Sequence, residues 1–322
     1  MLCLLYTNGV KFTVNQRARL DRVLAEQQVT VSRVKAGALI RRGCVLLNGR
    51  IIRKPAHLVQ PGDSVSMNDS EEQETESHIA PADLKLTVLY EDKSCLVLDK
   101  PAGIAVHPAP GLSKDEPTIL HGIAFLFKKM KIPFSASSIL AHRLDRETTG
   151  CLLIAKSPQA HTALQKQFKD RTIQKTYLAV VAGVPAQSEA HIDAPIGRSV
   201  SNRTKMSVLG STAARSAQTT YHVLAASAEA ALLACDLHTG RTHQIRVHLS
   251  AIGHPILGDE TYTSPESEAL SQKRKIHSLS LHAWKLSFHS PVKKVAQSIT
   301  APLPATLQNS LKTLSLPCPP NS

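Results

Sequence analysis

One dense polar segment, residues 142–150, contains the side chains best suited to acid–base or nucleophilic chemistry. It has the sequence His-Arg-Leu-Asp-Arg-Glu-Thr-Thr-Gly, and it lies between apolar residues at 139–140 and 152–155. Polar side chains on a loop that strands hold in place are where sites are commonly built. The segment offers two candidate acids, Asp145 and Glu147.

A second polar segment, residues 237–249, carries two arginines on a partly apolar element. Ile245 and Leu249 recur at helical spacing, so Arg241 and Arg246 would project from a partly buried helix. An arginine in such a place needs an anion. That anion is either a carboxylate from the first segment or a substrate phosphate.

Four histidines in and after this segment raise the question of a metal site. They stand five, five and six residues apart, unlike zinc ligands, and no cysteine pair or carboxylate cluster accompanies them: His238, His243, His248 and His254. The sequence therefore predicts no metal.

The overall charge indicates a polyanionic partner. The 322 residues include 38 Lys and Arg against 25 Asp and Glu, which gives a net charge of +13 and a pI near 9.6. Such a balance favours a nucleic acid or a lipid surface as the partner. The mean hydropathy is −0.10, and the chain has no apolar run of about 18 residues, so no membrane-spanning helix is expected.

The cysteines indicate a reducing compartment. The six cysteines are scattered and form no Cys-x-x-Cys pair, a pattern typical of reduced cytosolic thiols and unlike a zinc ribbon. The first twelve residues have a short apolar stretch with no basic segment before it, unlike a signal peptide. We therefore expect a cytoplasmic protein.

The distribution of charge along the chain indicates two domains. Residues 69–83 hold six acidic residues and no lysine or arginine, whereas the segments on both sides are net basic. This composition cannot bury a core, so an acidic linker is expected there. It separates a small domain over 17–68 from a larger one over 84–300. The proline-rich end, 301–322, is expected to be a disordered tail.

The small domain is predicted to contain two helices followed by short strands. Apolar residues recur at helical spacing over 20–24, and Ser32 can cap a second helix that ends near Gly43. The pair Asn48-Gly49 between apolar runs is a strong hairpin signal.

Over residues 17–67 this pattern resembles the S4-type RNA-binding domain. The resemblance rests on these residues in this order: Arg19-Leu20-Asp21, Gly43, Asn48-Gly49 and Gly62-Asp63. It implies RNA binding and no catalysis. The basic residues that could follow a phosphate backbone lie on or beside the two helices: Arg19, Arg33, Arg41 and Arg42.

The larger domain is predicted to mix strands and helices around the polar segments. Alternating apolar residues predict strands over 86–90 and 95–98. A loop rich in proline and glycine follows, on which Lys100 and His107 could line a site. A helix is predicted over 157–168, with a proline in its first turn.

Four separated motifs of this domain resemble the RluA family of RNA pseudouridine synthases. Its His-Arg-Leu-Asp signature is met without a gap. The motifs follow in the family's order at 142–150, 175–183, 240–248 and 253–259. The resemblance extends over about residues 84–290. Four motifs in order are far more specific than any one of them.

This resemblance implies that the chain isomerises uridine in RNA. The base is detached from C1′ of its ribose, rotated and rejoined through C5. The reaction is redox-neutral, so the resemblance implies no cofactor and no metal. The implied fold is α+β: an S4-type domain and a catalytic domain with a mixed, mainly antiparallel sheet, flanking helices and a cleft across the sheet.

The resemblance also assigns residues to the site. Asp145 matches the family's catalytic aspartate; a carboxylate can act as a nucleophile or stabilise positive charge at an anomeric carbon, and both mechanisms stay open. Arg246 matches the arginine that pairs with that aspartate, expected as a bidentate pair. Tyr177 and Ile245 match residues that contact the target base. Arg143 matches a residue that fills the stack in some relatives once the uridine has flipped out.

Other residues are expected to contact RNA outside the site. The basic residues expected at the RNA backbone in this domain are Arg198, Arg203, Lys205 and Arg241. Residues 264–275 have the pattern of an insertion with no role that the sequence assigns. The protein is expected to be a monomer.

The sequence leaves the RNA target open. The S4-type domain and Thr148-Thr149-Gly150 favour the RluD-like branch of the family, which acts on large-subunit (23S) ribosomal RNA; transfer RNA is the alternative. A non-catalytic ribosome-assembly factor is a further alternative, against which the complete set of site residues argues. An aminoacyl-tRNA synthetase is disfavoured. Residues 205–207 resemble half of the nucleotide-binding loop of such enzymes, but the sequence lacks the partner motif that would bind the adenylate.

Overall fold

The computed structural model describes residues 11–27, 29, 33–67, 79–109, 111–113, 115–202 and 204–319. It divides into two compact units, Met1–Ala80 and Pro81–Ser322. Ser32, Arg203 and most of the segment predicted as a linker lie outside the described residues, and the side chain of Arg42 is likewise not described.

The N-terminal unit has the helices and the hairpin that the sequence predicts. Its elements are β1 (Lys11–Thr13), β2 (Ala18–Arg19), α1 (Leu20–Glu26), α2 (Arg33–Arg42), β3 (Val45–Leu47), β4 (Arg50–Ile51), β5 (Leu58–Val59) and β6 (Ser64–Met67). The strands form a sheet in the order β1-β6-β3-β4 and a separate β2–β5 pair. Between β3 and β4, Asn48 and Gly49 have φ of 51° and 79°, as a tight hairpin turn requires.

One hydrophobic core holds this unit together. The buried faces of α1 and α2 pack against the sheet through residues that include Leu20, Leu24, Ile40, Val45 and Val65. The predicted helical spacing over 20–24 is therefore confirmed.

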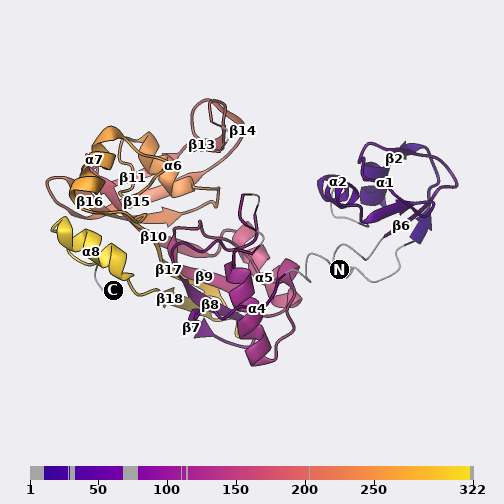
Figure 1. The fold of residues 1–322 in the computed structure, drawn as a ribbon, viewed down its shortest axis with the longest axis horizontal. Coiled ribbons are helices and arrows are strands. Elements are labelled where there is room, and N and C mark those ends of the chain that lie inside the picture. The colour runs from indigo at the N-terminus through magenta and orange to yellow at the C-terminus, as the bar shows by residue number, and fades with distance from the viewer. Residues whose placement is uncertain are drawn as a thin grey trace. The chain divides into compact units, whose positions relative to one another are not determined.

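The second unit is built on a mixed sheet of nine strands (Figure 1). The strands run in the order β11-β15-β16-β10-β17-β9-β8-β7, and β18 also pairs with β17. Their bounds are β7 (Thr87–Glu91), β8 (Cys95–Lys100), β9 (Thr149–Ala155), β10 (Gln174–Ala182), β11 (Glu189–Asp193), β15 (Gln218–Ala226), β16 (Ala230–Leu237), β17 (Leu281–His289) and β18 (Ala296–Thr300). All of the pairs are antiparallel except β9 with β17. The predicted mixed, mainly antiparallel sheet is confirmed.

Helices and a small second sheet flank this sheet. The helices are α4 (Ile119–Met130), α5 (Pro158–Lys169), α6 (Gln244–Ala251), α7 (Pro265–Lys273) and α8 (Ala305–Thr313), with a short 3-10 turn at Ala136–Ser138. The small sheet comprises β12 (Ile196–Ser199), β13 (Met206–Ser207) and β14 (Ser211–Arg215). None of the helices in the described residues is long and apolar enough to cross a membrane.

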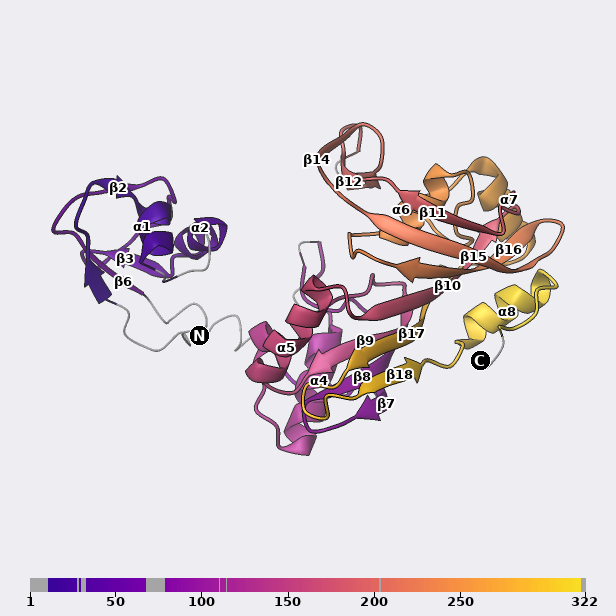
Figure 2. The ribbon, with the colours of Figure 1, turned by 180° about the vertical axis from the view of Figure 1, so that it is seen from behind.

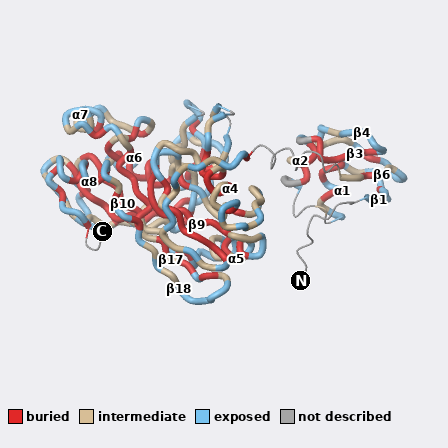
Figure 3. Tube along the Cα trace, turned by 60° about the horizontal axis from the view of Figure 1, so that its bottom comes forward, coloured by how far each residue is buried: buried red, intermediate tan, exposed pale blue. Residues whose placement is uncertain are grey.

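The start of α5 follows the predicted pattern. The hydroxyl of Ser157 accepts a hydrogen bond from the amide of Ala160, and Pro158 occupies the first turn, where its missing N–H costs nothing. Ala160 and Leu164 then face a core formed with β8, β9 and β17. Figure 3 shows this burial along the central strands.

Gly150 explains why the 142–150 segment ends in glycine. Its φ is 102°, and a Cβ at this position would lie 2.3 Å from the carbonyl oxygen of Ala283 on β17. No side chain fits where β9 and β17 approach this closely. The segment therefore enters the sheet at a fixed place.

The C-terminal residues form part of the core, contrary to the expectation of a disordered tail. Helix α8 places Leu307 and Leu311 against β10, β16 and Trp284, and Leu314 and Leu316 continue the same core. Figure 2 shows α8 beside β10 and β16. The prolines suggested disorder, but the apolar residues of 303–316 recur so that one face of the segment is buried.

The segment 264–275 is a capped helix. The hydroxyl of Ser264 accepts a hydrogen bond from the main-chain amide of Ser267, and the hydroxyl of Ser267 accepts one from the main-chain amide of Ser264. This pair is a capping box, and Pro265 occupies the first turn of α7. Leu270 and Ile276 pack on the same core as α8.

The packing of α8 predicts a measurable loss of stability on truncation. Leu311 is 1% exposed, so Leu311→Ala should lower the free energy of unfolding by about 2–5 kcal/mol. Urea unfolding followed by fluorescence reports this core directly, because Trp284 is the one tryptophan of the chain. The exposed neighbour change Asn309→Ala is the control. Equal midpoints for the two variants would show that α8 does not stabilise the unit.

Candidate active site

A cleft of about 530 Å³ opens beside the predicted polar segments. Its walls come from 141–148, the end of α5, the start of β10 and 237–246. The lining side chains include one carboxylate, that of Asp145, and seven cationic groups: Arg143, Lys169, Arg171, Lys175, Arg215, Arg241 and Arg246. Such a cleft attracts a polyanion and places a single acid within its reach.

Asp145 lies in a tight turn just before β9. The amide of Thr148 donates to the main-chain oxygen of Asp145 at 3.2 Å. The carboxylate itself turns toward α6 and is 24% exposed. Its oxygen Oδ2 is the one that meets cationic groups, whereas the described residues give Oδ1 no hydrogen-bond or ion-pair partner.

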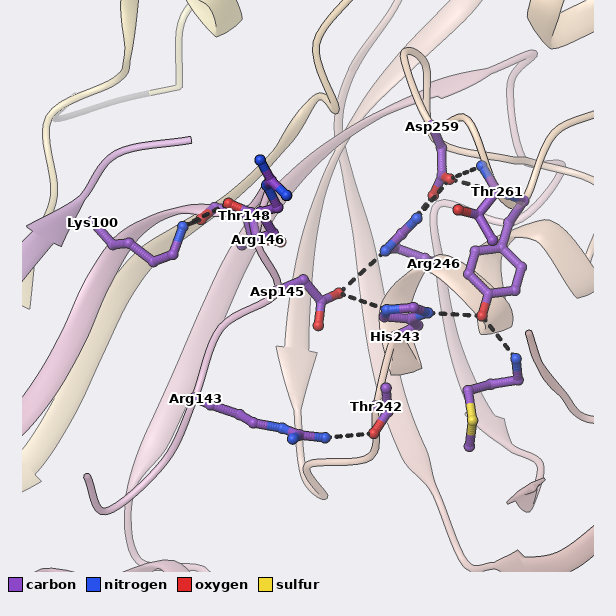
Figure 4. A network of polar contacts seen from close by, with 12 residues as sticks. Lys100, Arg143, Asp145, Arg146, Thr148, Thr242, His243, Arg246, Asp259 and Thr261 are labelled. Atoms are coloured by element: carbon purple, nitrogen blue, oxygen red, sulfur yellow. Dashed lines mark hydrogen bonds and ion pairs between the residues drawn. The ribbon is translucent and has the colours of Figure 1, made fainter. Parts of the chain in front are cut away.

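Lys100 anchors this turn and does not line the cleft. Its ammonium is fully buried and donates to the carbonyl oxygens of Pro101 (2.7 Å), Arg146 (2.7 Å) and Thr148 (3.0 Å). Burial lowers the pKa of Lys100 to about 8, while Glu147 and Asp145 favour the charged form. Three carbonyl acceptors match the three donors of an ammonium, so this side chain fixes the backbone that follows the catalytic candidate (Figure 4).

The expected bidentate partner of Arg246 is a different aspartate. Its Nε and Nη2 donate to the two oxygens of Asp259 at 2.6 and 2.8 Å. Its Nη1 lies 3.5 Å from Oδ2 of Asp145. The Asp259 side chain is 0% exposed, against 24% for Asp145, and a buried carboxylate needs its countercharge more than a partly hydrated one does. Arg246 therefore bridges two carboxylates (Figure 4).

Asp259 itself is held by the backbone. Its Oδ1 accepts from the amides of Thr261 and Tyr262 at 2.8 and 3.0 Å. The ring of Tyr262 lies 5.1 Å from the guanidinium carbon of Arg246. Burial alone would lower the pKa of Arg246, but the hydrogen bond with Asp259 and the charges of Asp259 and Asp145 together outweigh it and raise that pKa. The arginine is thus a fixed cation at the side of Asp145.

His243 is a second group that reaches Asp145. Its Nε2 lies 4.0 Å from Oδ2 of Asp145, and its Nδ1 lies 2.9 Å from the hydroxyl of Tyr262. Burial lowers the pKa of His243, against the opposing effect of Asp145. In the sequence, His243 stands out only as one of four histidines without the spacing of zinc ligands, and the sequence predicts no role for Asp259 or Tyr262.

Tyr177 and Ile245 lie where a base could be held. Both line the cleft and are 7% and 4% exposed. Burial, together with the charge of Asp145, raises the pKa of the Tyr177 hydroxyl. Tyr177 therefore presents a neutral aromatic ring to the cleft.

Arg143 lines the cleft and is exposed to solvent, whereas Glu147 lies outside the cleft. Arg143 is exposed, and its Nη2 donates to the hydroxyl of Thr242 at 2.8 Å. This contact joins the 142–150 segment to the 237–249 segment across the cleft. Glu147 is exposed and does not line the cleft.

Several polar residues of 239–248 hold the backbone in place. The side-chain oxygen of Gln244 accepts from the hydroxyl of Thr239 and from the main-chain N–H of Arg241. Its side-chain nitrogen donates to the carbonyl of Gln218 and to the hydroxyl of Thr219. His248 bonds Thr219 and the carbonyl of Ala194. The dense run of side chains able to form hydrogen bonds at 239–248 is the sequence signal that could have predicted this network.

The residues predicted to contact RNA in this unit have varied surroundings. Arg241 lines the cleft, and its Nε donates to the carbonyl of Ser216 at 3.0 Å. The Nζ of Lys205 donates to the carbonyl of Thr261 at 2.7 Å and so braces the loop after Asp259. Arg198 is exposed on β12.

In the N-terminal unit two of the predicted basic residues, Arg19 and Arg33, lie near one acid. Arg19 makes a bidentate pair with Asp21 at 3.0 and 2.8 Å, and Arg33 approaches the same carboxylate at 3.4 Å. The hydrogen bond from Arg19 lowers the pKa of Asp21. Arg41 is exposed on α2.

Comparison with known proteins agrees with this fold. The family model of RNA pseudouridylate synthases matches residues 94–251, and the model of the S4 domain matches residues 18–65. The chain is 35% identical over 303 residues to ribosomal large subunit pseudouridine synthase D of Zymomonas mobilis subsp. mobilis, with 92% of this chain and 94% of that protein covered. It is 36% identical over 294 residues to RNA pseudouridine synthase 2, chloroplastic, of Arabidopsis thaliana, with 80% and 67% covered.

A solved structure gives the same result. Human RNA pseudouridylate synthase domain containing 4 superposes with a TM-score of 0.57 at 29% identity, over 72% of this chain and 94% of that one. The chain belongs to the RNA pseudouridine synthases of the RluA family, and it carries an N-terminal S4 domain. It is an RNA pseudouridine synthase.

The Arg246–Asp259 pair predicts a strong effect on folding. Asp259→Ala leaves a buried guanidinium without its main partner, so the free energy of unfolding should fall by about 3 kcal/mol or more. Urea unfolding measures the change, with the exposed neighbour change Glu260→Gln as the control. Equal stability of the two variants would contradict a buried, mutually dependent pair.

Lys175 predicts a pH dependence of RNA affinity. Burial lowers its pKa to about 8, so its ammonium is charged below that pH and neutral above it. Affinity for RNA should fall as the pH rises from 7 to 9, by about tenfold, or about 1.4 kcal/mol, if the cation meets one phosphate. The dissociation constant at both pH values tests this. Lys175→Arg should remove the dependence, whereas Lys169→Arg, which changes an exposed lysine of the same cleft, should leave it unchanged.

Proposed function

We propose that this protein isomerises uridines in large-subunit (23S) ribosomal RNA to pseudouridine and that Asp145 is its catalytic residue. The observation that carries the assignment is the position of Asp145 as the one carboxylate among the described residues that line a cationic cleft. The names of several relatives, such as the Zymomonas mobilis protein, support ribosomal RNA as the substrate. The S4 domain is consistent with a large folded RNA.

The site residues divide the chemistry among them. The C1′–N1 bond of the uridine breaks, a C1′–C5 bond forms, and the proton lost from C5 is balanced by one gained at N1. A carboxylate at C1′ can act as a nucleophile or stabilise the positive charge that develops there. Arg246 keeps Asp145 beside a fixed cation, and Tyr177 and Ile245 provide the apolar surface on which a base can stack.

The cations of the cleft support binding of the RNA backbone. Lys175 and Arg241 line its interior, and Arg143 stands at its mouth. A cleft that neutralises several phosphates gives an affinity that falls steeply with salt. Ribosomal RNA as the substrate would place the enzyme in the cytoplasm.

The direct test maps pseudouridines in total RNA by carbodiimide-dependent stops of reverse transcription. Three strains are compared: wild type, a deletion of the gene, and the deletion complemented with Asp145→Asn. Specific stops in large-subunit ribosomal RNA should vanish on deletion and should not return with Asp145→Asn, because an amide cannot supply the carboxylate charge. Complementation with Glu147→Gln, a change in the same segment outside the cleft, should restore them.

The other outcomes select the alternatives. Loss of stops in transfer RNA alone would keep the enzyme and replace the substrate. Stops restored by Asp145→Asn would remove Asp145 from the chemistry. Unchanged stops in every RNA class would favour a non-catalytic assembly factor. RNA binding by the Asp145→Asn protein does not by itself distinguish that factor from the enzyme, because both would bind RNA.

A further inference from the structure

The two oxygens of Asp145 have different surroundings. Oδ2 faces Nη1 of Arg246 at 3.5 Å and Nε2 of His243 at 4.0 Å, and both of these groups come from the start of α6. Among the described residues Oδ1 has no such partner. A carboxylate held through one oxygen presents the other in a defined direction.

The backbone of His243 is shaped for this contact. His243 is the residue before α6, yet its side chain makes no capping hydrogen bond, and its φ of 55° places it in the left-handed region. This conformation is strained for a non-glycine residue, and residues with such backbone strain are common at functional sites. The ring lies with its Nε2 toward Asp145 (Figure 4).

Tyr262 selects the tautomer of His243. The amide of Met206 donates to the Tyr262 hydroxyl oxygen at 2.9 Å. The hydroxyl proton of Tyr262 then has one acceptor within reach among the described residues, Nδ1 of His243 at 2.9 Å. With Nδ1 accepting, the neutral ring carries its proton on Nε2, and Nε2 is the atom that faces Asp145.

We propose that His243 is a positioning residue for the uridine isomerisation: held by Tyr262 with the proton on Nε2, it fixes Oδ2 of Asp145 together with Arg246, so that Oδ1 faces C1′ of the target uridine. The separation of 4.0 Å is longer than a hydrogen bond. Such contacts are often long in the free enzyme and shorten in the substrate complex. The inference rests on the proposed catalytic role of Asp145.

The charges around His243 agree with a neutral ring. Burial lowers its pKa, Arg246 and Arg143 act in the same direction, and Asp145 and Asp259 oppose them. The ring is therefore neutral at pH 7. Protonation at lower pH would place a second full cation at Oδ2 and displace the Tyr262 proton from Nδ1.

The loop 259–262 links the site to the small sheet. Met206 lies on β13, and its neighbour Lys205 bonds the carbonyl of Thr261. The loop 259–262 thus receives contacts from β13 on one side and supports both partners of Asp145 on the other. Its hydrogen bonds place Tyr262 at the junction.

The test measures single-turnover release of tritium from in vitro transcribed 23S ribosomal RNA that carries [5-³H]uridine, since isomerisation expels the hydrogen at C5. His243→Ala should lower the rate constant about tenfold or more, with the RNA dissociation constant unchanged. His243→Gln should recover much of the rate, because its amide N–H can replace Nε2. The exposed change His277→Ala is the control.

Tyr262→Phe tests the tautomer separately. The phenyl ring keeps the packing, but the donor to Nδ1 is lost, so the pKa of His243 should rise and the acid limb of the pH–rate profile should move to higher pH. The acid limb should not move in the same way in His243→Gln, which has no imidazole, or in Tyr221→Phe, a change of a buried tyrosine on β15. Thermal unfolding of each variant shows that the fold is kept.

Two results would overturn the inference. One is a wild-type rate for His243→Ala; the other is a loss of rate that matches a loss of RNA affinity, with no rescue by glutamine. Failure of the proposed function would give a different result. The wild-type protein would then release no tritium, or the Asp145→Asn protein would release it, whatever the His243 variants do.

Discussion

The site depends on one arginine shared between two carboxylates. Arg246 makes its short, bidentate bonds with the buried Asp259 and reaches Asp145 with the nitrogen that remains. Because a buried carboxylate is costly without a countercharge, Asp259 fixes the arginine firmly. The partly exposed Asp145 then meets a cation that cannot swing away, and it keeps one oxygen for the cleft.

The rest of the unit holds these groups in register. Lys100 ties the main chain at Arg146 and Thr148, within the 145–148 turn, to the end of β8. Gly150 lets β9 lie against β17, and Gln244 fixes the loop that leads into α6. Asp145 comes from one polar segment and its partners from another, so their mutual geometry depends on a rigid sheet between them. Helix α8 extends the core of that sheet on β10 and β16.

The sequence predicted the class of fold, the helix at 157–168, the N-terminal hairpin and the segments that form the cleft, because these depend on local spacing and on motifs. It did not predict that Arg246 pairs bidentately with Asp259, since the choice between two carboxylates depends on burial, which only the fold sets. The role of Lys100 was missed for the same reason: a lysine beside a Pro/Gly-rich loop gives no sign that its ammonium is buried. The prolines of the C-terminal segment predict disorder, but the leucines of 303–316 form one apolar face that is buried in the structure.

A crystal structure of the Asp145→Asn variant with its target RNA would test the account most directly. The account predicts a flipped uridine on Tyr177, its C1′ closest to the atom of residue 145 that faces away from Arg246, and the Arg246–Asp259 pair unchanged. An Arg246 that has left Asp259 to bind an RNA phosphate, or a ribose placed away from residue 145, would contradict it.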